Sequence, residues 1–377
     1  MPYWIAHLFN LWRYDVKFGL FYLFSDFGDI PQDQIFNEVL EEIEYSEELG
    51  FDSVWLPEHH FAVYGMLGNP LTMAAAISQR THHMKIGTAI MVLPFQHPLR
   101  VAEDAALVDA LSGGRLMLGV GRGYQPPEFN GFGVTQENSR SMFLESFEIL
   151  RRALSGEKFA YEGTHWQIKE PTEVFPKPIQ KPHPPFYMAA VSPSSYEYAA
   201  KFGISLLRSP QFTNLGTVAQ AFDSYRDMMA DQGFDADAID QPFSVRTFVA
   251  PTDEEAKAET KHVVWFYHLL ATLLPGAPGR PAPETGYENY PRDPSALSKI
   301  TTQDVWERGT AFGSPERVIS QMKRYMHEAG ATSFLHQMRI GGLEHKKVMR
   351  SMELYAKHVM PALREEEMRM KEAAVVA

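Results

Sequence analysis

The chain has 377 residues, 45% of them hydrophobic, no cysteine and a formal net charge of −12. A negative chain without a basic block lacks the attraction to phosphate backbones that nucleic-acid binding needs. Without cysteine there is no disulfide, no thiolate metal site and no cysteine nucleophile. No apolar run approaches membrane-spanning length, and residues 1–16 lack the charged start and unbroken apolar stretch of a signal peptide, so we expect a cytoplasmic protein.

Strand-like and helix-like segments alternate along the first half of the chain. The first strand is predicted at residues 17–22, followed by a helix with Ile35, Val39 and Ile43 on one face and an end near Gly50. The pattern then repeats three times. Strands are expected at residues 53–56, 84–90 and 116–119, and the helices that follow them at 69–80, 98–112 and 140–154.

The alternation continues after a polar, proline-rich stretch at residues 156–184. Strands are predicted at 185–188, 206–209 and 243–249, with helices at 194–202, at 215–232 and from 253. The eighth strand is expected at 333–337 and its helix at 344–360.

Eight strand–helix units in strict alternation predict parallel strands joined by crossover helices, and eight such units close a barrel. The predicted fold class is therefore α/β, a (β/α)8 TIM barrel in one domain at residues 17–363. An N-terminal extension (1–16) and a C-terminal tail (364–377) flank it. Such barrels run about 250 residues, so we expect an insertion late in the barrel, around 275–294. A doubly wound open sheet is the alternative, but no Gly-rich phosphate fingerprint follows the first strand.

In this barrel the chemistry lies at the C-terminal ends of the strands. The second strand leads into Glu58, His59 and His60. Adjacent side chains of an extended segment point opposite ways, so at most one histidine faces the barrel mouth. A histidine there can move protons near neutral pH, although a lone one is at least as often a structural hydrogen-bonding group. Metal hydrolases need ligands on several strand ends, so no metal site is predicted.

Three further cues point to a phosphate group. Gly121 and Arg122 follow the fourth strand, Arg140 opens the next helix, and Ser192 and Ser195 open the helix after the fifth strand. Glycines allow close backbone approach, guanidinium groups bind phosphate, and a serine-capped helix start favours an anion. Each cue alone indicates only a turn, a cap or a solvated charge, so the prediction of one phosphate site depends on their convergence.

The run at residues 51–61, FDSVWLPEHHF, closely resembles bacterial luciferase and its flavin-dependent relatives. Similar motifs occur in the same order at residues 68–70, 87–90, 93–104, 113–115, 121–123, 138–140 and 313–318. The resemblance covers residues 17–363 and implies the luciferase-like barrel.

The resemblance also implies roles for single residues. His59 takes the place of the active-site histidine, Glu58 lines the flavin site, and Ala89–Ile90 matches an unusual non-proline cis peptide beneath the flavin ring. The positions implied for holding FMN are Ala89, Ile90, Gly121, Arg122, Tyr124, Arg140, Ser192, Ser195 and Ser209. Gly121 departs from the light-emitting subunit, which has a reactive cysteine there, and this argues against bioluminescence but not against flavin binding.

The implied activity is that of a two-component monooxygenase. Reduced FMN, supplied by a separate NAD(P)H flavin reductase, reacts with O2 to a peroxyflavin that oxygenates a small apolar substrate. A homodimer is implied as well. The alternatives are a deazaflavin-dependent oxidoreductase that transfers hydride, a noncatalytic flavin-binding protein, against which Glu58 and His59 argue, and an unrelated metal hydrolase.

Overall fold

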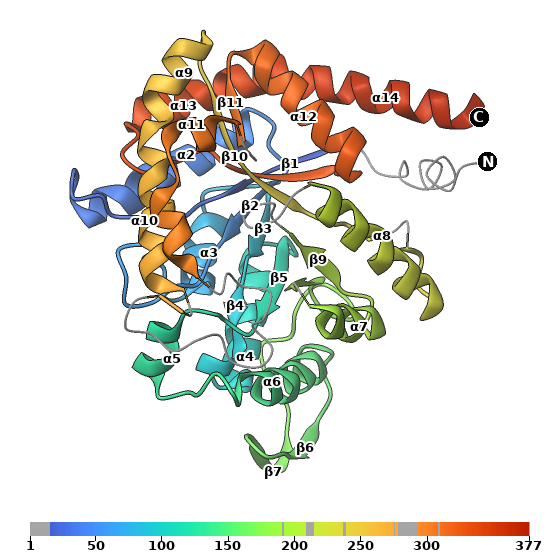
Figure 1. The fold of residues 1–377 in the computed structure, drawn as a ribbon. Coiled ribbons are helices and arrows are strands. Elements are labelled where there is room, and N and C mark those ends of the chain that lie inside the picture. Colours follow the sequence, from blue (N-terminus) through green and yellow to red (C-terminus); the bar gives the residue numbers. More distant parts are fainter. Residues whose placement is uncertain are drawn as a thin grey trace.

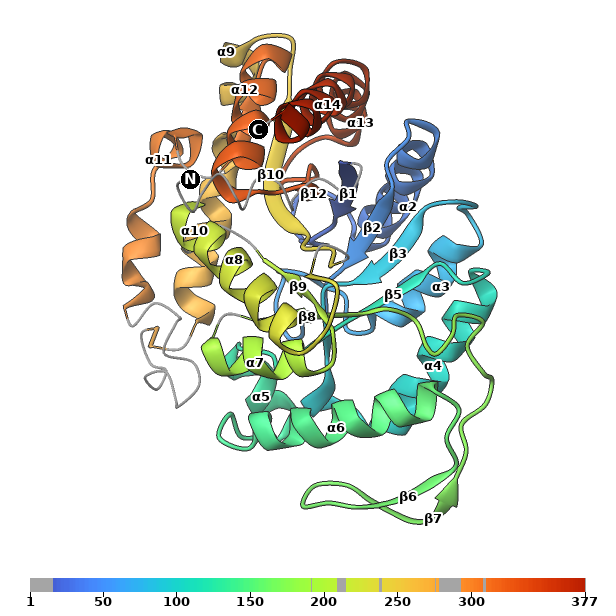
Figure 2. The same ribbon diagram turned by 90° about the vertical axis from the view of Figure 1, so that its right-hand side faces the viewer.

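The computed structural model describes residues 16–190, 192–208, 215–236, 239–274, 276–277, 293–307 and 310–376. A curled sheet of parallel strands forms its centre, and helices surround the sheet (Figures 1 and 2). The strands of this sheet are β1 (Lys17–Phe21), β2 (Ser53–Leu56), β3 (Lys85–Thr88), β4 (Met91–Val92), β5 (Leu116–Gly121), β8 (Phe186–Ala189), β9 (Ser205–Leu207), β10 (Phe243–Val249), β11 (Thr310–Gly313) and β12 (Ser333–Gln337).

The helices connect successive strands, as the alternation predicts. The longer ones are α2 (Gln32–Glu48), α3 (Pro70–Ser78), α4 (Pro98–Leu111), α6 (Ser139–Leu154), α7 (Pro193–Lys201), α8 (Leu215–Asp231), α10 (Val264–Leu273), α12 (Pro315–Ala329), α13 (His345–Leu354) and α14 (Met360–Val376). Their bounds follow the local signals. Asn69, for example, accepts hydrogen bonds from the N–H groups of Leu71 and Thr72 and so caps α3, which has Pro70 as its first residue.

The strand order is β11-β10-β12-β1-β2-β3-β5-β8-β9, with β4 also paired to β5. Parallel pairing of neighbours along the chain is thereby confirmed, but the expected closed barrel is confirmed only in part. In the described residues the two ends of the sheet meet at one parallel bridge, between Arg208 and Phe243. The reason is that β9 has only three residues, and β11 occupies the edge of β10 from Arg246 to Val249. The sheet is therefore a curled half-barrel.

Side chains on the concave side of the sheet form a small inner core. Trp55, Met117, Tyr187 and Leu335 come from four different strands and pack together. The convex side packs on the helices in a much larger core, to which α2 contributes Val39 and Ile43 as predicted. Ile35, predicted on the same helix face, is buried as well. This alternation along each strand separates the residues that face the interior from those that hold the helices.

Two connections differ from the predicted pattern. The polar stretch after α6 forms an antiparallel hairpin of β6 (Phe159–Glu162) and β7 (Gln167–Thr172) that lies outside α6 (Figure 2). A short helix, α5 (Pro126–Phe132), interrupts the connection between β5 and α6. The helix expected from residue 253 is present as α9 (Asp253–Glu259), and α10 follows it. Most of the insertion expected around 275–294 lies outside the described residues, and α11 (Thr302–Glu307), β11 and α12 after it were not predicted.

The C-terminal tail expected at residues 364–377 belongs to α14, which continues to Val376. The buried carboxylate of Glu367 in this helix accepts a hydrogen bond of 2.9 Å from the backbone N–H of Val16. The beginning of the described chain is thus attached to its last helix. Residues 1–15, the rest of the expected N-terminal extension, lie outside the described residues.

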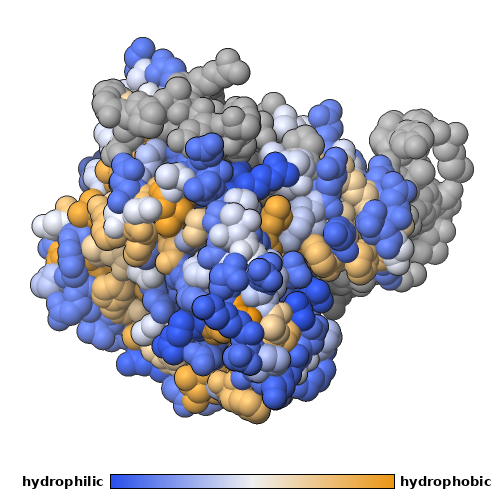
Figure 3. All heavy atoms as spheres, turned by 90° about the horizontal axis from the view of Figure 1, so that it is seen from below, coloured by the Kyte–Doolittle hydropathy of each residue, from blue (hydrophilic) through white to orange (hydrophobic). Residues whose placement is uncertain are grey.

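The molecular surface is mixed in character. Seen from below, hydrophobic patches are interrupted by hydrophilic residues (Figure 3). In the part of the chain that the structure describes, no helix combines the length and the apolar character needed to cross a membrane.

Candidate active site

A cavity of about 220 Å³ lies at the carboxyl ends of β2, β3, β5 and β8. Its lining includes the rings of Phe21 and Tyr64 together with backbone and polar groups. Seven of the residues predicted from the sequence line it, namely Glu58, His59, Ala89, Ile90, Arg122, Tyr124 and Ser195. The structure therefore brings together residues from four different strand ends.

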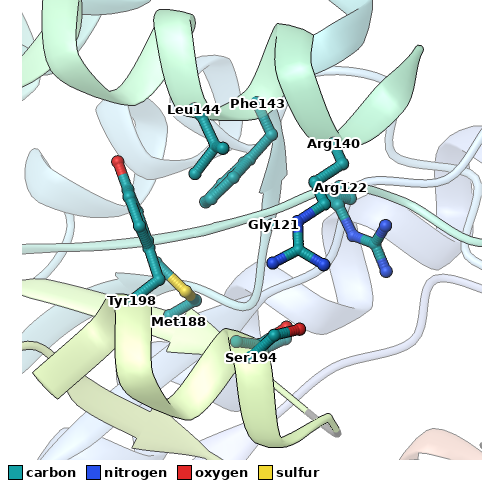
Figure 4. Close-up of a pocket in the computed structure, with 10 residues that line it drawn as sticks. Gly121, Arg122, Arg140, Phe143, Leu144, Met188, Ser194 and Tyr198 are labelled. Atoms are coloured by element: carbon teal, nitrogen blue, oxygen red, sulfur yellow. The ribbon is translucent and has the colours of Figure 1, made fainter. Parts of the chain in front are cut away.

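A second, narrower pocket adjoins the cavity and shares Arg122, Ala189 and Ser195 with it. Figure 4 shows Arg122 and Arg140 close together on one side of this pocket, with Ser194 of the first turn of α7 across from them. Two guanidinium groups and hydroxyls at a helix start suit an anion such as a phosphate.

The serine-rich start of α7 differs from its prediction in one detail. Ser192 occupies the N-cap position, but its side chain accepts no hydrogen bond from the helix backbone. Its hydroxyl is engaged instead with the hydroxyl of Ser195, 2.8 Å away. The expected side-chain cap is therefore wrong. Ser209, the remaining predicted cofactor residue, lies outside the described residues.

His59 is held by a carboxylate that the sequence pattern did not single out. Its Nδ1 lies 2.9 Å from Oε1 of Glu128 in α5, and the same oxygen accepts the backbone N–H of His60 at 3.1 Å. The side chain of Glu128 is 1% exposed, and the Nε2 of Gln125 lies 3.1 Å from the same Nδ1. When Nδ1–H of a histidine donates to a carboxylate, Nε2 of the same ring is free to accept a proton from a ligand.

Glu58 is buried and connects several backbone and side-chain groups. One of its oxygens accepts the N–H of Val92 at 2.9 Å, and the other lies 3.1 Å from Nε2 of His60. Burial raises the pKa of the Glu58 carboxyl, and the hydrogen bonds from His60, Val92 and Gln96 oppose this shift. Glu58 therefore fixes the segment that follows the end of β3 while it lines the cavity.

The two adjacent histidines point in different directions, as predicted. His59 lines the cavity, whereas the ring of His60 packs between aromatic rings, 4.6 Å from Phe132 and 5.9 Å from Phe95. His60 is therefore a packing and hydrogen-bonding residue.

The peptide bond between Ala89 and Ile90 is cis, as the resemblance implies. Gly121 lies against this segment, and a Cβ atom at residue 121 would come within 2.1 Å of Cδ1 of Ile90. The side chain of Ile90 thus takes up the space beside Gly121, and a side chain at residue 121 would have to displace the end of Ile90.

Among the described residues, no group of three or more His, Asp or Glu side chains is placed to hold a metal ion. The cavity combines a proton-transfer pair with an adjoining anion pocket. This arrangement can bind a molecule that has a phosphate at one end and a flat, uncharged body at the other.

The chain resembles known proteins over nearly its whole length. The family model of luciferase-like monooxygenases matches residues 16–333. The alkanal monooxygenase alpha chain of Photorhabdus laumondii is 27% identical, covering 93% of this chain and 99% of its own. The oxygenase component of the flavin-dependent trigonelline monooxygenase of Acinetobacter baylyi is 25% identical, with 96% and 99% covered.

Solved structures show the same fold. A monooxygenase from Streptomyces bottropensis has a TM-score of 0.79 at 27% identity, covering 92% of this chain and 99% of its own. The oxygenating constituent of 3,6-diketocamphane monooxygenase from Pseudomonas putida, in complex with FMN, has a TM-score of 0.75 at 19% identity, with 92% and 98% covered. An F420-dependent secondary alcohol dehydrogenase has a TM-score of 0.72 at 18% identity, with 93% and 99% covered.

Proposed function

Because the chain belongs to the family of luciferase-like monooxygenases, we propose that it is the oxygenase of a two-component system that uses reduced FMN and O2 to oxygenate a small organic substrate. The observation that carries this proposal is the continuity of two pockets, one lined by Arg122 and Arg140 and the other by His59. They match the phosphate and the ring of one flavin mononucleotide.

The residues present fit this cofactor. Arg122, Arg140 and the hydroxyls of Ser192 and Ser195 would hold the phosphate, because a cationic pair and a helix start offer it charge-assisted hydrogen bonds. The ring system would lie against the Ala89–Ile90 segment, with Tyr124 and Glu58 at its edges. Gly121 leaves no side chain in the passage between the two pockets.

When bound and reduced, the flavin supplies the electrons that activate O2. His59 is placed to give a proton to, or take one from, a group beside its Nε2, while Glu128 holds Nδ1 and keeps the imidazole in one orientation. Phe21 and Tyr64 line the cavity with ring carbons, and this helps to exclude water from the reacting groups.

We further propose that a separate flavin reductase supplies the reduced cofactor. The related trigonelline monooxygenase of Acinetobacter baylyi is named as an oxygenase component, which supports the use of a separate reductase. A homodimer through the first helices is part of the same proposal, supported by an apolar groove of about 360 Å³ between α2 and α3 that contains Phe36, Leu40 and Met73.

The test is an anaerobic titration with reduced FMN and with reduced riboflavin, which lacks the phosphate. We expect FMN to bind at least about tenfold more tightly, because charge-assisted hydrogen bonds contribute about 1.5–3 kcal/mol each. Arg140→Met should remove most of this difference, and the exposed control Arg100→Met should leave it unchanged. Equal affinities for the two flavins, or preferential binding of F420, would contradict the proposal and favour the hydride-transferring branch.

A further inference from the structure

Arg246 of β10 faces the interior of the curled sheet. Its neighbour Thr247 points the other way, since Thr247 Oγ1 lies 2.8 Å from Nδ1 of His336, whose ring packs 4.4 Å from Tyr355 under the helices. Side chains alternate along a strand, so Arg246 projects inward. Arg246 pairs in register with Gln337 of β12. The preceding residue of β12, His336, pairs with Leu20 of β1. Arg246 therefore lies at the same height in the sheet as Phe21, which lines the cavity.

The guanidinium group of Arg246 is buried without a counter-ion. The residue is 6% exposed, and Nη1 donates a hydrogen bond of 2.9 Å to the hydroxyl of Tyr267 in α10. Its Cζ lies 4.1 Å from the ring centre of Phe266. Nη2 is buried and has no hydrogen-bond partner, and no carboxylate of the described residues forms an ion pair with this arginine.

This environment is costly for a cation. A buried charge is ordinarily paired and fully hydrogen-bonded. Contacts with the faces of Phe266 and Tyr267 offset only part of the cost, since a cation–π contact is weaker than the hydration that a buried charge loses. An anionic oxygen bound at Nη2 would accept a hydrogen bond from this remaining donor and would also balance the positive charge.

The arginine is connected to the cavity through aromatic side chains. The ring of Phe266 lies 5.3 Å from that of Tyr64, which lines the cavity. Burial raises the pKa of Tyr64 to about 12, and the positive charge of Arg246 opposes this shift, as expected for two neighbouring groups. Arg122 directly follows β5 and Arg140 belongs to α6, whereas Arg246 lies in β10 on another part of the sheet. A flavin phosphate bound at Arg122 and Arg140 therefore leaves Arg246 unoccupied.

We infer that Arg246 anchors a carboxylate of the substrate, and that the substrates are small, otherwise apolar carboxylic acids. Glu58 and Glu128 line the cavity at His59, where their negative charges repel a carboxylate. The substrate would therefore bind with its acid group toward β10 and its apolar body toward His59. The inference rests on the proposed function, because it assumes that the cavity holds substrate beside the flavin.

The experiment is a calorimetric titration of the protein holding oxidised FMN, with cyclohexanecarboxylate and with its uncharged methyl ester as probes. We expect the carboxylate to bind at least about tenfold more tightly than the ester. Arg246→Met should weaken the carboxylate by about tenfold to 100-fold and leave the ester unchanged. Arg246→Lys keeps the charge without the planar fork and should give an intermediate loss, while the exposed control Arg100→Met should bind both probes like the wild type.

Equal binding of the two probes by the wild type, or undiminished binding of the carboxylate by Arg246→Met, would overturn the inference. If Arg246→Met does not fold, Arg246→Lys and Tyr267→Phe decide. Tyr267→Phe leaves the guanidinium group in place and must still bind the carboxylate more tightly than the ester. Neither reduced flavin nor O2 takes part in this titration, so a failure here is distinguishable from a failure to bind reduced FMN.

Discussion

At the scale of single residues, the contact between His59 and Glu128 determines how the proposed proton transfer works. Replacing Glu128 with Gln keeps an oxygen for the N–H of His60 but removes the negative charge beside Nδ1 of His59. We expect the rate of substrate oxygenation to fall about tenfold to 100-fold and more O2 to be released as hydrogen peroxide. The measurement is the ratio of product to hydrogen peroxide, together with the pH–rate profile.

The control for this variant is the affinity for reduced FMN, which should change little because Glu128 does not line the anion pocket. A purely structural role of Glu128 would lower the melting temperature and leave the pH–rate profile and the product ratio as in the wild type. That outcome would contradict the positioning role.

A buried histidine makes the stability of the fold sensitive to acid. Burial lowers the pKa of His336 to about 3, below the value near 6.5 of an unfolded chain. The folded state therefore binds fewer protons, so the contribution of His336 to the free energy of unfolding is complete above about pH 6.5 and declines as the pH falls toward 3. Acidification from about pH 7 to pH 4.5 should lower the free energy of unfolding by about 3 kcal/mol through this residue alone.

Urea unfolding of the wild type and His336→Gln at these two pH values measures this contribution. The variant should lose less stability on acidification, whereas the exposed control His82→Gln should lose as much as the wild type. The same loss in all three proteins would show that His336 is not the acid-sensitive group.

At the scale of secondary-structure elements, the β6–β7 hairpin depends on one carboxylate. Glu145 of α6 accepts hydrogen bonds from the backbone N–H groups of Thr164, His165 and Trp166 at the hairpin turn. Glu145→Gln replaces one acceptor oxygen with an NH2 donor. This donor would face backbone N–H groups, so the hydrogen bonds that the oxygen accepted from them are lost. We expect faster proteolytic cleavage within residues 162–167 and a change of less than about threefold in FMN affinity. The exposed control Glu137→Gln should be cleaved like the wild type, and cleavage of Glu145→Gln at the wild-type rate would contradict this role.

How much the sequence predicts also differs from element to element. The bounds of α2, α3 and α4 follow from apolar spacing and caps, which act within a few residues. Helix α5 was not predicted, although Pro126 and Pro127 are typical of a helix start. It has seven residues, too few for a helical period to appear.

The candidate site shows the same division. His59, Glu58 and the two arginines belong to local motifs, so the sequence identifies them. Glu128 and Arg246 reach their partners only through the curl of the sheet, over sequence separations of 69 residues from His59 and 21 from Tyr267. Spacing along the chain carries no signal for such contacts, and a charged residue within a β-rich segment was the only hint of Arg246.

At the scale of the whole molecule, the joint between the ends of the sheet is its weakest part. The described residues connect β9 to β10 by the Arg208–Phe243 bridge, whereas β1 and β12 share four register pairs. Amides with few neighbouring hydrogen bonds exchange through local opening. We expect peptides covering residues 204–208 to exchange deuterium faster than those covering 17–21 and 333–337, as measured by mass spectrometry. Equal protection of the two groups would indicate a closed barrel in solution.

The hydrogen bond between Val16 and Glu367 has a consequence for engineering. It places the start of the described chain beside the last helix, which extends only nine residues further, about 14 Å, to Val376. A linker of about five residues could bridge that length. A polypeptide without residues 1–15 and Ala377 could then be circularly permuted, with new ends in the turn between Glu162 and Gln167, outside α6 and away from the groups that line the cavity. Such a protein would offer an attachment point for a fused reductase that leaves all strands of the sheet intact.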